Sequence, residues 1–203
     1  MRRILILPLA TMMGIISSCN SNQKSATTAD SSSTNPLFTK STLPFEAPPF
    51  DKIKDSDFKP ALEEGMKQHL NEIEKIASNP DAPTFDNTLV AMEKSGELLI
   101  RTNRVLNVLT GANTDSTLQK LQEEEAPKLA AHQDAIFLNS KLFSRVKAIY
   151  DSRASLKLDP ESLRLVEYYF QLFEKAGANL SDADKTKLKA LNEQEALIKR
   201  QIQ

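Results

Sequence analysis

The side chains that could act in catalysis or bind a metal are few and scattered along this chain. Its two histidines, His69 and His132, fall in different helical stretches, and neither belongs to a His-Glu-x-x-His pair. His69 lies next to an apolar row and His132 at a core spacing, so we expect ordinary packed or surface histidines rather than metal ligands. We therefore predict no catalytic and no metal-binding residue in this chain.

The remaining candidate clusters point to structure rather than chemistry. The acidic run Glu123 to Glu125 could suggest a cation site, but successive residues on a helix point in different directions, so we expect a solvated face. Tyr168 and Tyr169, like the phenylalanines at helical spacing, predict core rather than a ligand pocket. The chain has only 5 glycines, and they form no phosphate-binding loop. A Ser-His-Asp arrangement stays open, because such residues meet only in the fold, but nothing local supports one.

Cys19 ends a segment that resembles a bacterial lipoprotein signal. Two arginines precede an apolar run, Ile4–Ile16, which is too short to span a bilayer, and the letters ISSC that end at Cys19 resemble a lipobox. The resemblance implies that residues 1–18 are a signal peptide and that Cys19 is lipidated. The lipid would hold the chain at a membrane of the bacterial cell envelope, facing the periplasm or the exterior. A plain signal peptide with an incidental cysteine is the alternative.

Composition divides the rest of the chain into a tether and a folded domain. Residues 19–42 are rich in Ser, Thr, Asn and Ala, and such a segment buries too little apolar surface to fold, so we expect a flexible tether. Residues 43–203 fit the size of one domain. The net charge is −1 and no basic patch occurs, so no nucleic-acid partner is expected.

Apolar residues in this domain recur every three or four positions, and no two-residue alternation typical of strands occurs. This pattern predicts an all-α fold, an antiparallel helical bundle joined by short loops. Before it, the proline-rich stretch 43–50 predicts an extended arm that lies over the helices through Phe45 and Phe50. The expected helices begin at Asp57, Thr84, Ser116 (capping box with Gln119, kink or interruption at Pro127), Lys141, Asp159 (ending at Gly177) and Ser181.

The stretch Ala82–Arg101 predicts a single helix with Thr84 as its N-cap. Gly96 falls inside the apolar row of this helix, where a glycine costs about 1 kcal/mol relative to alanine. The usual compensation is the close approach of another backbone, so we predict a helix contact at Gly96.

The last helix should turn Leu188, Leu191, Ile198 and Ile202 inward. It is still in helical phase at Gln203, with no terminal glycine, no following proline and no polar tail. We expect the domain to be truncated at its C-terminal end; a helix that ends the protein is the alternative.

Seven blocks of sequence occur in a characteristic order. They read PFEAPPFDKI, FKPALEEGM, APTFDNT, MEKSGELL, APKLAAHQDAIFLN, LFSRVKAIYD and AGANLS. Together they resemble the N-terminal region of the thimet oligopeptidase family of zinc peptidases, with peptidyl-dipeptidases as the nearest branch. The resemblance covers about residues 35–203.

The resemblance implies a long, mostly helical, clam-like enzyme with a deep channel. Its zinc, held by a His-Glu-x-x-His helix and a later Glu, hydrolyses short peptides, and peptidyl-dipeptidases release dipeptides from the C-terminus. No position here matches those residues, so zinc is implied only for the full-length family member. The present region would be the helical wall and lid that narrow the channel.

Two functions follow. The first is the N-terminal, substrate-gating portion of a zinc-dependent peptidyl-dipeptidase, which meets short peptides in the channel of the complete enzyme. The second is a stand-alone helical lipoprotein that acts as a binding or scaffold module without catalysis.

Overall fold

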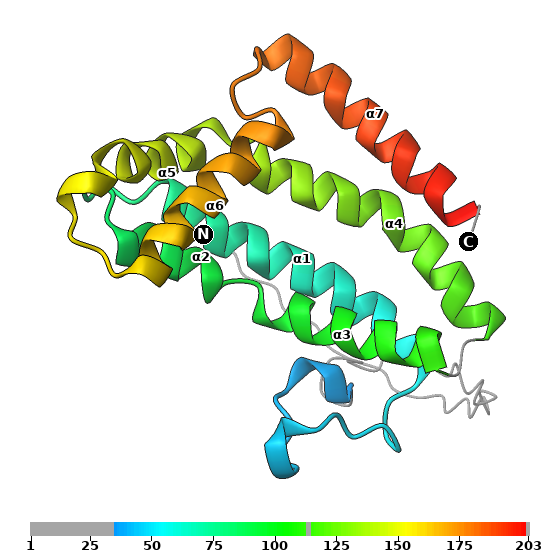
Figure 1. The fold of residues 1–203 in the computed structure, drawn as a ribbon. Coiled ribbons are helices and arrows are strands. Elements are labelled where there is room, and N and C mark those ends of the chain that lie inside the picture. Colours follow the sequence, from blue (N-terminus) through cyan, green and yellow to red (C-terminus); the bar gives the residue numbers. More distant parts are fainter. Residues whose placement is uncertain (1–34, 113–114, 202–203) are drawn as a thin grey trace, which may run out of the picture. The chain divides into compact units, whose positions relative to one another are not determined.

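The computed structural model describes residues 35–112 and 115–201, and Figure 1 shows an arrangement of helices. The longer helices are α1 (Asp55–Ala77), α3 (Glu97–Ala112), α4 (Ser116–Phe137), α5 (Ser140–Ser152), α6 (Pro160–Ala176) and α7 (Asp182–Gln201). The shorter segments are η1 (Pro36–Phe38), η2 (Pro44–Glu46), η3 (Phe85–Val90), α2 (Ala91–Glu93) and η4 (Arg153–Ser155). The described residues contain no strand, so the predicted all-α class is confirmed.

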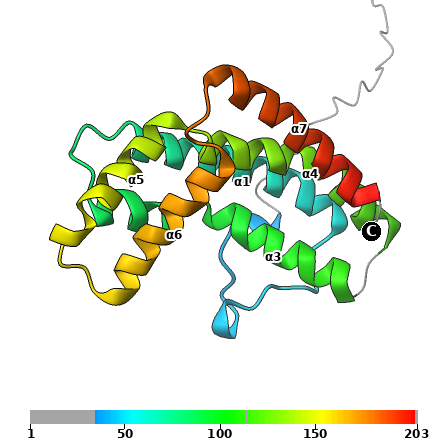
Figure 2. The same cartoon turned by 45° about the horizontal axis from the view of Figure 1, so that its top comes forward.

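Helices α1 and α4 lie against each other, and each has a second long neighbour. Helix α3 runs back along α1, and α7 runs back along α4 (Figure 1). Helices α5 and α6 pack together near the C-terminal end of α1, as the turned view in Figure 2 also shows. The long pairs α1–α3 and α4–α7 are therefore antiparallel, although neither pair is joined by a short loop, since α5 and α6 separate α4 from α7 in the chain.

Two clusters of buried apolar side chains hold these helices together. One joins the second half of α1 to α2, α5 and α6, with Leu142, Val146 and Phe173 fully buried. The other joins the first half of α1 to α3 and α4 around Phe58 and Leu62. Burial of each such side chain contributes about 1.5–3 kcal/mol, so both clusters stabilise the fold.

The prediction of one helix over Ala82–Arg101 is wrong. The chain forms the π-helical segment η3 and then α2, breaks at Ser95 and Gly96, and restarts as α3. Gly96 has a φ of 73°, a left-handed conformation that side-chain-bearing residues rarely adopt, and this ends the helical run. Thr84 is the N-cap as predicted, because its side-chain oxygen accepts a hydrogen bond of 3.0 Å from the Asn87 N–H.

The close helix contact predicted at Gly96 belongs to Gly65 instead. A Cβ at Gly65 would lie 2.9 Å from the backbone N and Cα of Leu99, so only a glycine lets α1 and α3 approach this closely. At Gly96 the near neighbour is a side chain, the ring of His69.

Several predicted helix boundaries are shifted. Helix α1 begins at Asp55, and Asp57 lies in its first turn, where its carboxylate accepts a 2.8 Å hydrogen bond from the Lys54 N–H. Asp115, rather than Ser116, caps α4. The same helix continues through Pro127, so of the kink or interruption predicted there the interruption does not occur.

The ends of α6 agree with the sequence. Asp159 caps the helix with Pro160 at its first position, and Gly177 ends it with a left-handed φ of 94°. Both positions satisfy backbone groups that a helix end leaves unpaired.

The proline-rich arm does not pack over the helices through its phenylalanines as predicted. Phe45 is fully exposed and Phe50 is about half exposed. The buried contact comes earlier, from Leu37 in η1, against α1 and α3. The folded part therefore includes residues before Leu43, which the sequence assigns to the tether.

The inward face predicted for the last helix is also wrong. Leu188 is half-buried, but Leu191 and Ile198 of α7 are exposed, and Ile202 lies outside the described residues. No helix among the described residues has the length and hydropathy needed to cross a membrane.

Candidate functional site

The two histidines, which the sequence treats as unrelated, meet between α1 and α4. His69 Nδ1 lies 3.0 Å from His132 Nε2, and the ring centroids are 4.9 Å apart. The predicted packed state fits His132, which is only 6% exposed. Sequence reasoning missed the pairing because 63 residues separate the two positions, and only the α1–α4 packing brings them together.

A third polar side chain continues this row. His69 Nε2 lies 3.1 Å from Ser95 Oγ, and the Ser95 hydroxyl donates a 2.6 Å hydrogen bond to the carbonyl of Met92. The neighbouring Gly96 N–H donates to the carboxylate of Glu72 at 2.7 Å. The turn between α2 and α3 is thus held by two side chains of α1.

These contacts determine where the protons lie. Because the Ser95 proton is used on Met92, His69 Nε2 must carry a proton and donate it to Ser95. His69 Nδ1 is then an acceptor for the proton on His132 Nε2. This leaves His132 Nδ1 as a bare acceptor, buried and without a partner.

Burial keeps both rings neutral. It lowers the pKa of His69, and the carboxylate of Glu72 only partly opposes this shift. Burial, followed by the neighbouring His69, lowers the pKa of His132 to about 4. An uncharged pair fits the proton pattern. A second proton on His69 would place its Nδ1–H against the Nε2–H of His132, and a second proton on His132 would lie on the buried Nδ1, which has no partner.

The order Ser95–His69–His132 resembles the connectivity of a nucleophilic triad, but its details do not fit one. A catalytic serine gives its proton to the histidine, whereas Ser95 gives its proton to a backbone carbonyl. Ser95 is also buried and does not line the neighbouring cavities. The row therefore joins α1, α4 and the α2–α3 turn structurally.

Two cavities lie along α4, and the first of them borders the two histidines. A cavity of about 560 Å³ has the two histidines and apolar side chains of α1, α3 and α4 in its wall, and Ala196 and Lys199 of α7 close one side. A second cavity, of about 850 Å³, is more polar and includes Asp134 and Asn192. Both are lined by α4 and α7, so these helices leave open space between them.

The acidic run is not the uniformly solvated face that the sequence predicts. Glu123 and Glu124 are exposed, and Glu124 pairs with Lys59 at 3.0 Å. Glu125 is 1% exposed and pairs with Lys128 at 2.8 Å, which also pairs with Glu63 at 2.6 Å. Bonds to these two carboxylates raise the pKa of Lys128.

Among residues 35–112 and 115–201, no group of three or more His, Cys, Asp or Glu is placed to hold a metal ion. The proposed lipid attachment point, Cys19, lies outside the described residues. Tyr168 is half-exposed and Tyr169 partly buried, with its hydroxyl donating to Glu93 at 2.7 Å. The tyrosine pair is thus at the edge of the core.

Comparison with known proteins identifies relatives of this chain, although no family model matches it. It is 49% identical over 170 residues to a dipeptidyl carboxypeptidase of Salmonella typhimurium and 48% identical over 168 residues to one of Escherichia coli. A weaker match, 22% identical over 147 residues, is oligopeptidase A of Escherichia coli.

The matches cover most of this chain but little of the relatives. The alignment with the Salmonella protein includes 84% of this chain and 25% of that protein, so the chain spans about a quarter of its length. The Escherichia coli dipeptidyl carboxypeptidase gives the same share, 25%. These matches confirm the predicted resemblance: over the part that aligns, this chain is related to the dipeptidyl carboxypeptidases of the thimet oligopeptidase family.

Proposed function

We propose that this chain is the N-terminal, non-catalytic portion of a zinc-dependent peptidyl-dipeptidase. The observation that carries the proposal is the 49% identity to a dipeptidyl carboxypeptidase over a match that covers only 25% of that protein. Identity at this level over 170 residues supports a shared role for the matched region. The catalytic residues would then lie in the part that this chain does not span.

The described residues do not fit the zinc site of such an enzyme. A catalytic zinc needs three protein ligands and an open position. The facing nitrogens of His69 and His132 bond to each other, and the Glu125 carboxylate is paired with Lys128. We therefore assign no catalytic step to this chain.

The role that remains is to shape access to a channel. A layer of long helices is rigid enough to act as a wall, and a wall that narrows a channel admits extended peptides and excludes folded proteins. The substrates of the complete enzyme would be short peptides, from which it releases C-terminal dipeptides.

The attachment to the envelope is a separate part of the proposal. The lipobox-like sequence before Cys19 supports lipidation of that residue, and residues after it would form the tether. A Cys19→Ser variant should lose both incorporated palmitate and membrane association in a bacterial host, while Ser17→Ala should keep both. Membrane association that survives Cys19→Ser would contradict the lipid anchor.

A chimera tests the enzymatic proposal. In the dipeptidyl carboxypeptidase of Escherichia coli, the aligned region is replaced by this chain from residue 35 onward. The chimera should release C-terminal dipeptides from a short peptide in the presence of zinc and leave a stably folded protein intact. A folded, zinc-loaded chimera that releases no dipeptide would contradict the proposal and favour the stand-alone lipoprotein.

A further inference from the structure

The cavity of about 560 Å³ beside the histidine pair has the size and the wall of a small-molecule site. Such sites typically measure about 300–1,000 Å³ and are mostly apolar, with a few polar groups that orient the ligand. Most of this wall is apolar and includes Ile73 of α1, Leu99 of α3 and Ile136 of α4. The cavity is therefore large enough for a molecule of one or two rings.

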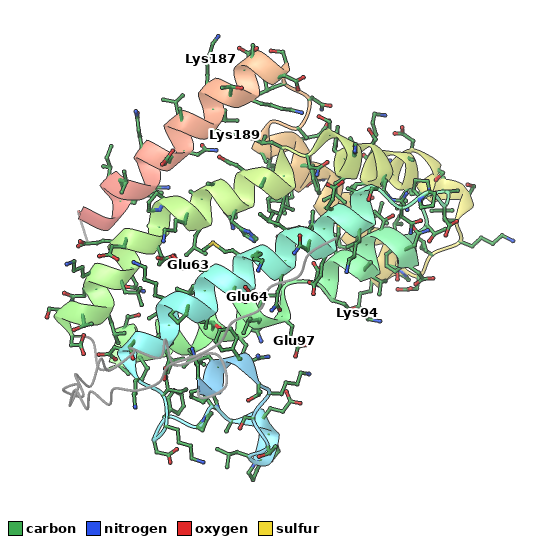
Figure 3. All side chains as sticks on the ribbon, turned by 180° about the vertical axis from the view of Figure 1, so that it is seen from behind. Glu63, Glu64, Lys94, Glu97, Lys187 and Lys189 are labelled. Atoms are coloured by element: carbon green, nitrogen blue, oxygen red, sulfur yellow. The ribbon has the colours of Figure 1, made fainter. Side chains whose placement is uncertain are left out.

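The charges around this cavity favour an uncharged ligand. Among the described residues, Lys199 is the one charged side chain in its wall, and its ammonium group pairs with Glu195 at 2.7 Å. Both histidines of the wall are neutral, because burial lowers the pKa of His69 and of His132. None of the charged residues labelled in Figure 3 lines the cavity. An ion would thus lose its water there without gaining an opposite charge, which is costly.

His132 supplies this wall with a hydrogen-bond acceptor that has no partner. The side chain is only 6% exposed, and its ring borders the cavity. Its Nε2 proton is used on His69, 3.0 Å away, so Nδ1 keeps a lone pair, and no described residue donates to it. A buried acceptor without a partner is unfavourable, and a donor on a ligand would remove this penalty.

The rest of the histidine row determines that His132 Nδ1 accepts and does not donate. His69 donates to Ser95, and Ser95 donates to the carbonyl of Met92, so each proton in the row has one place. To reverse the row, the Ser95 hydroxyl would have to leave that carbonyl. A donor at His132 Nδ1 would extend the row by one bond in the same direction, and hydrogen bonds in such a chain strengthen one another.

We propose that this cavity binds a neutral small molecule with an apolar body and an N–H or O–H group, which donates to His132 Nδ1. The apolar body lies against Ile73, Leu99 and Ile136. Because Nδ1 is buried in the unbound chain, a side chain of the wall must move to admit the ligand. Met92 belongs to this wall, and its unbranched side chain adapts readily to a new neighbour. The proposal goes beyond the proposed function and does not depend on it, since this chain alone contains the site.

Indole and indene test the proposal, because the two molecules have the same two-ring shape but only indole carries an N–H group. In calorimetric titrations of the full chain, indole should bind at least about threefold more tightly than indene, as one additional hydrogen bond implies. An N–H group without a partner would instead oppose entry into an apolar cavity. Indene that binds as tightly as indole, or no binding of either molecule, would overturn the proposal.

Nitrogen NMR identifies the atom that accepts the hydrogen bond. The chain has 2 histidines, so a chain made with isotope-labelled histidine gives signals from His69 and His132 alone. Indole should move the His132 Nδ1 resonance upfield, as acceptance of a hydrogen bond does, and indene should leave it in place. Indole that binds without moving this resonance would contradict the assignment.

Two variants of the wall give an independent test. His132→Leu removes the acceptor and keeps an apolar side chain, so in this variant indene should bind at least as tightly as indole. Asn103→Leu changes another polar residue of the same wall and should keep the preference for indole. A preference for indole that survives the loss of His132 would refute the proposal. If His132→Leu does not fold, the NMR measurement on the unchanged chain decides.

Discussion

The α5–α6 region and the contact between α4 and α7 differ in how completely they are packed. In the first, Phe143 and Phe173 stack with ring centroids 5.9 Å apart, and Tyr150 stacks on Phe170 at 3.8 Å. In the second, Asn192 meets Asp134, whose other carboxylate oxygen is buried without a partner, and cavities of about 560 and 850 Å³ border both helices.

A buried arginine strengthens the contrast. Arg145 of α5 donates to the carbonyls of Asn79 and Asp81 at 2.9 and 3.0 Å and to Asn87 Oδ1 at 2.9 Å, so it ties the segment before η3 to α5. Among the described residues, the side-chain hydrogen bond between α7 and α4 is the one from Asn192 to Asp134. The difference teaches that fully buried rings and a buried cation hold the α5–α6 region, whereas α7 is held partly by polar bonds beside open space.

The largest expected effect is on the packed region. Phe173 is fully buried against Phe137 and Phe143, so Phe173→Ala should lower the free energy of unfolding by about 3–5 kcal/mol. Leu191→Ala removes a side chain that is already 61% exposed and should change it by no more than about 0.5 kcal/mol. Urea unfolding of the chain measures both changes. Similar losses from the two variants would contradict the difference in packing between the two regions.

Low pH should lower the stability of the protein through the buried His132. The pKa of His132 is lowered from 6.5 to about 4, so its contribution to stability is complete above pH 6.5 and is lost as the pH falls toward 4. A shift of this size corresponds to about 3 kcal/mol. Urea unfolding at pH 7, 5 and 4 should show a smaller loss for His132→Leu than for the unchanged chain. Parallel pH profiles would refute a neutral buried His132.

Two glycines differ in the space around them: Gly65 lies against another backbone, and Gly111 has no neighbouring atom close by. Gly65→Ala places a Cβ 2.9 Å from the Leu99 backbone and should cost about 1–3 kcal/mol. Gly111→Ala meets no atom within 4 Å in α3 and should stabilise the chain by about 0.5–1 kcal/mol. Thermal unfolding distinguishes the two, and a harmless Gly65→Ala would contradict the close α1–α3 contact.

The smallest effect concerns Asp134, where burial raises the pKa. A raised pKa gives a contribution that is present at low pH and lost as the pH rises through the folded value, the reverse of His132. Asp134→Asn should therefore stabilise the chain at pH 7 and lose this advantage near pH 3. Urea unfolding measures this difference in stability. Equal stability of the two proteins at pH 7 would contradict a destabilising effect of burial on the charged Asp134 carboxylate.

Local sequence rules predicted the all-α class and several helix ends, because caps such as Asp159 and Gly177 act within a few residues. These rules failed where contacts between residues far apart in the sequence determine the structure. Lys185 and Asn192 set the rotation of α7 through Ser140 and Asp134, so Leu191 and Ile198, which were predicted to face inward, are exposed.

The histidine row was missed for the same reason. Neither His69 nor His132 lies in a local motif, and their meeting depends on how α1 packs on α4. Gly96 gave a usable signal, an expensive glycine in an apolar row, but its cause is a left-handed φ of 73° beside a histidine ring. A positive φ ends a helix, whereas a close contact does not.

The claim that the α5–α6 region is packed more completely than the contact between α4 and α7 is tested most directly by hydrogen exchange of the native protein. The backbone amides of residues 166–173 in α6 should exchange only when most of the protein unfolds, because Val166 and Phe173 are fully buried. The amides of residues 188–192 in α7 should exchange through an opening that costs at least about 2 kcal/mol less, because α7 borders open space. Equal protection of the two segments would contradict the account.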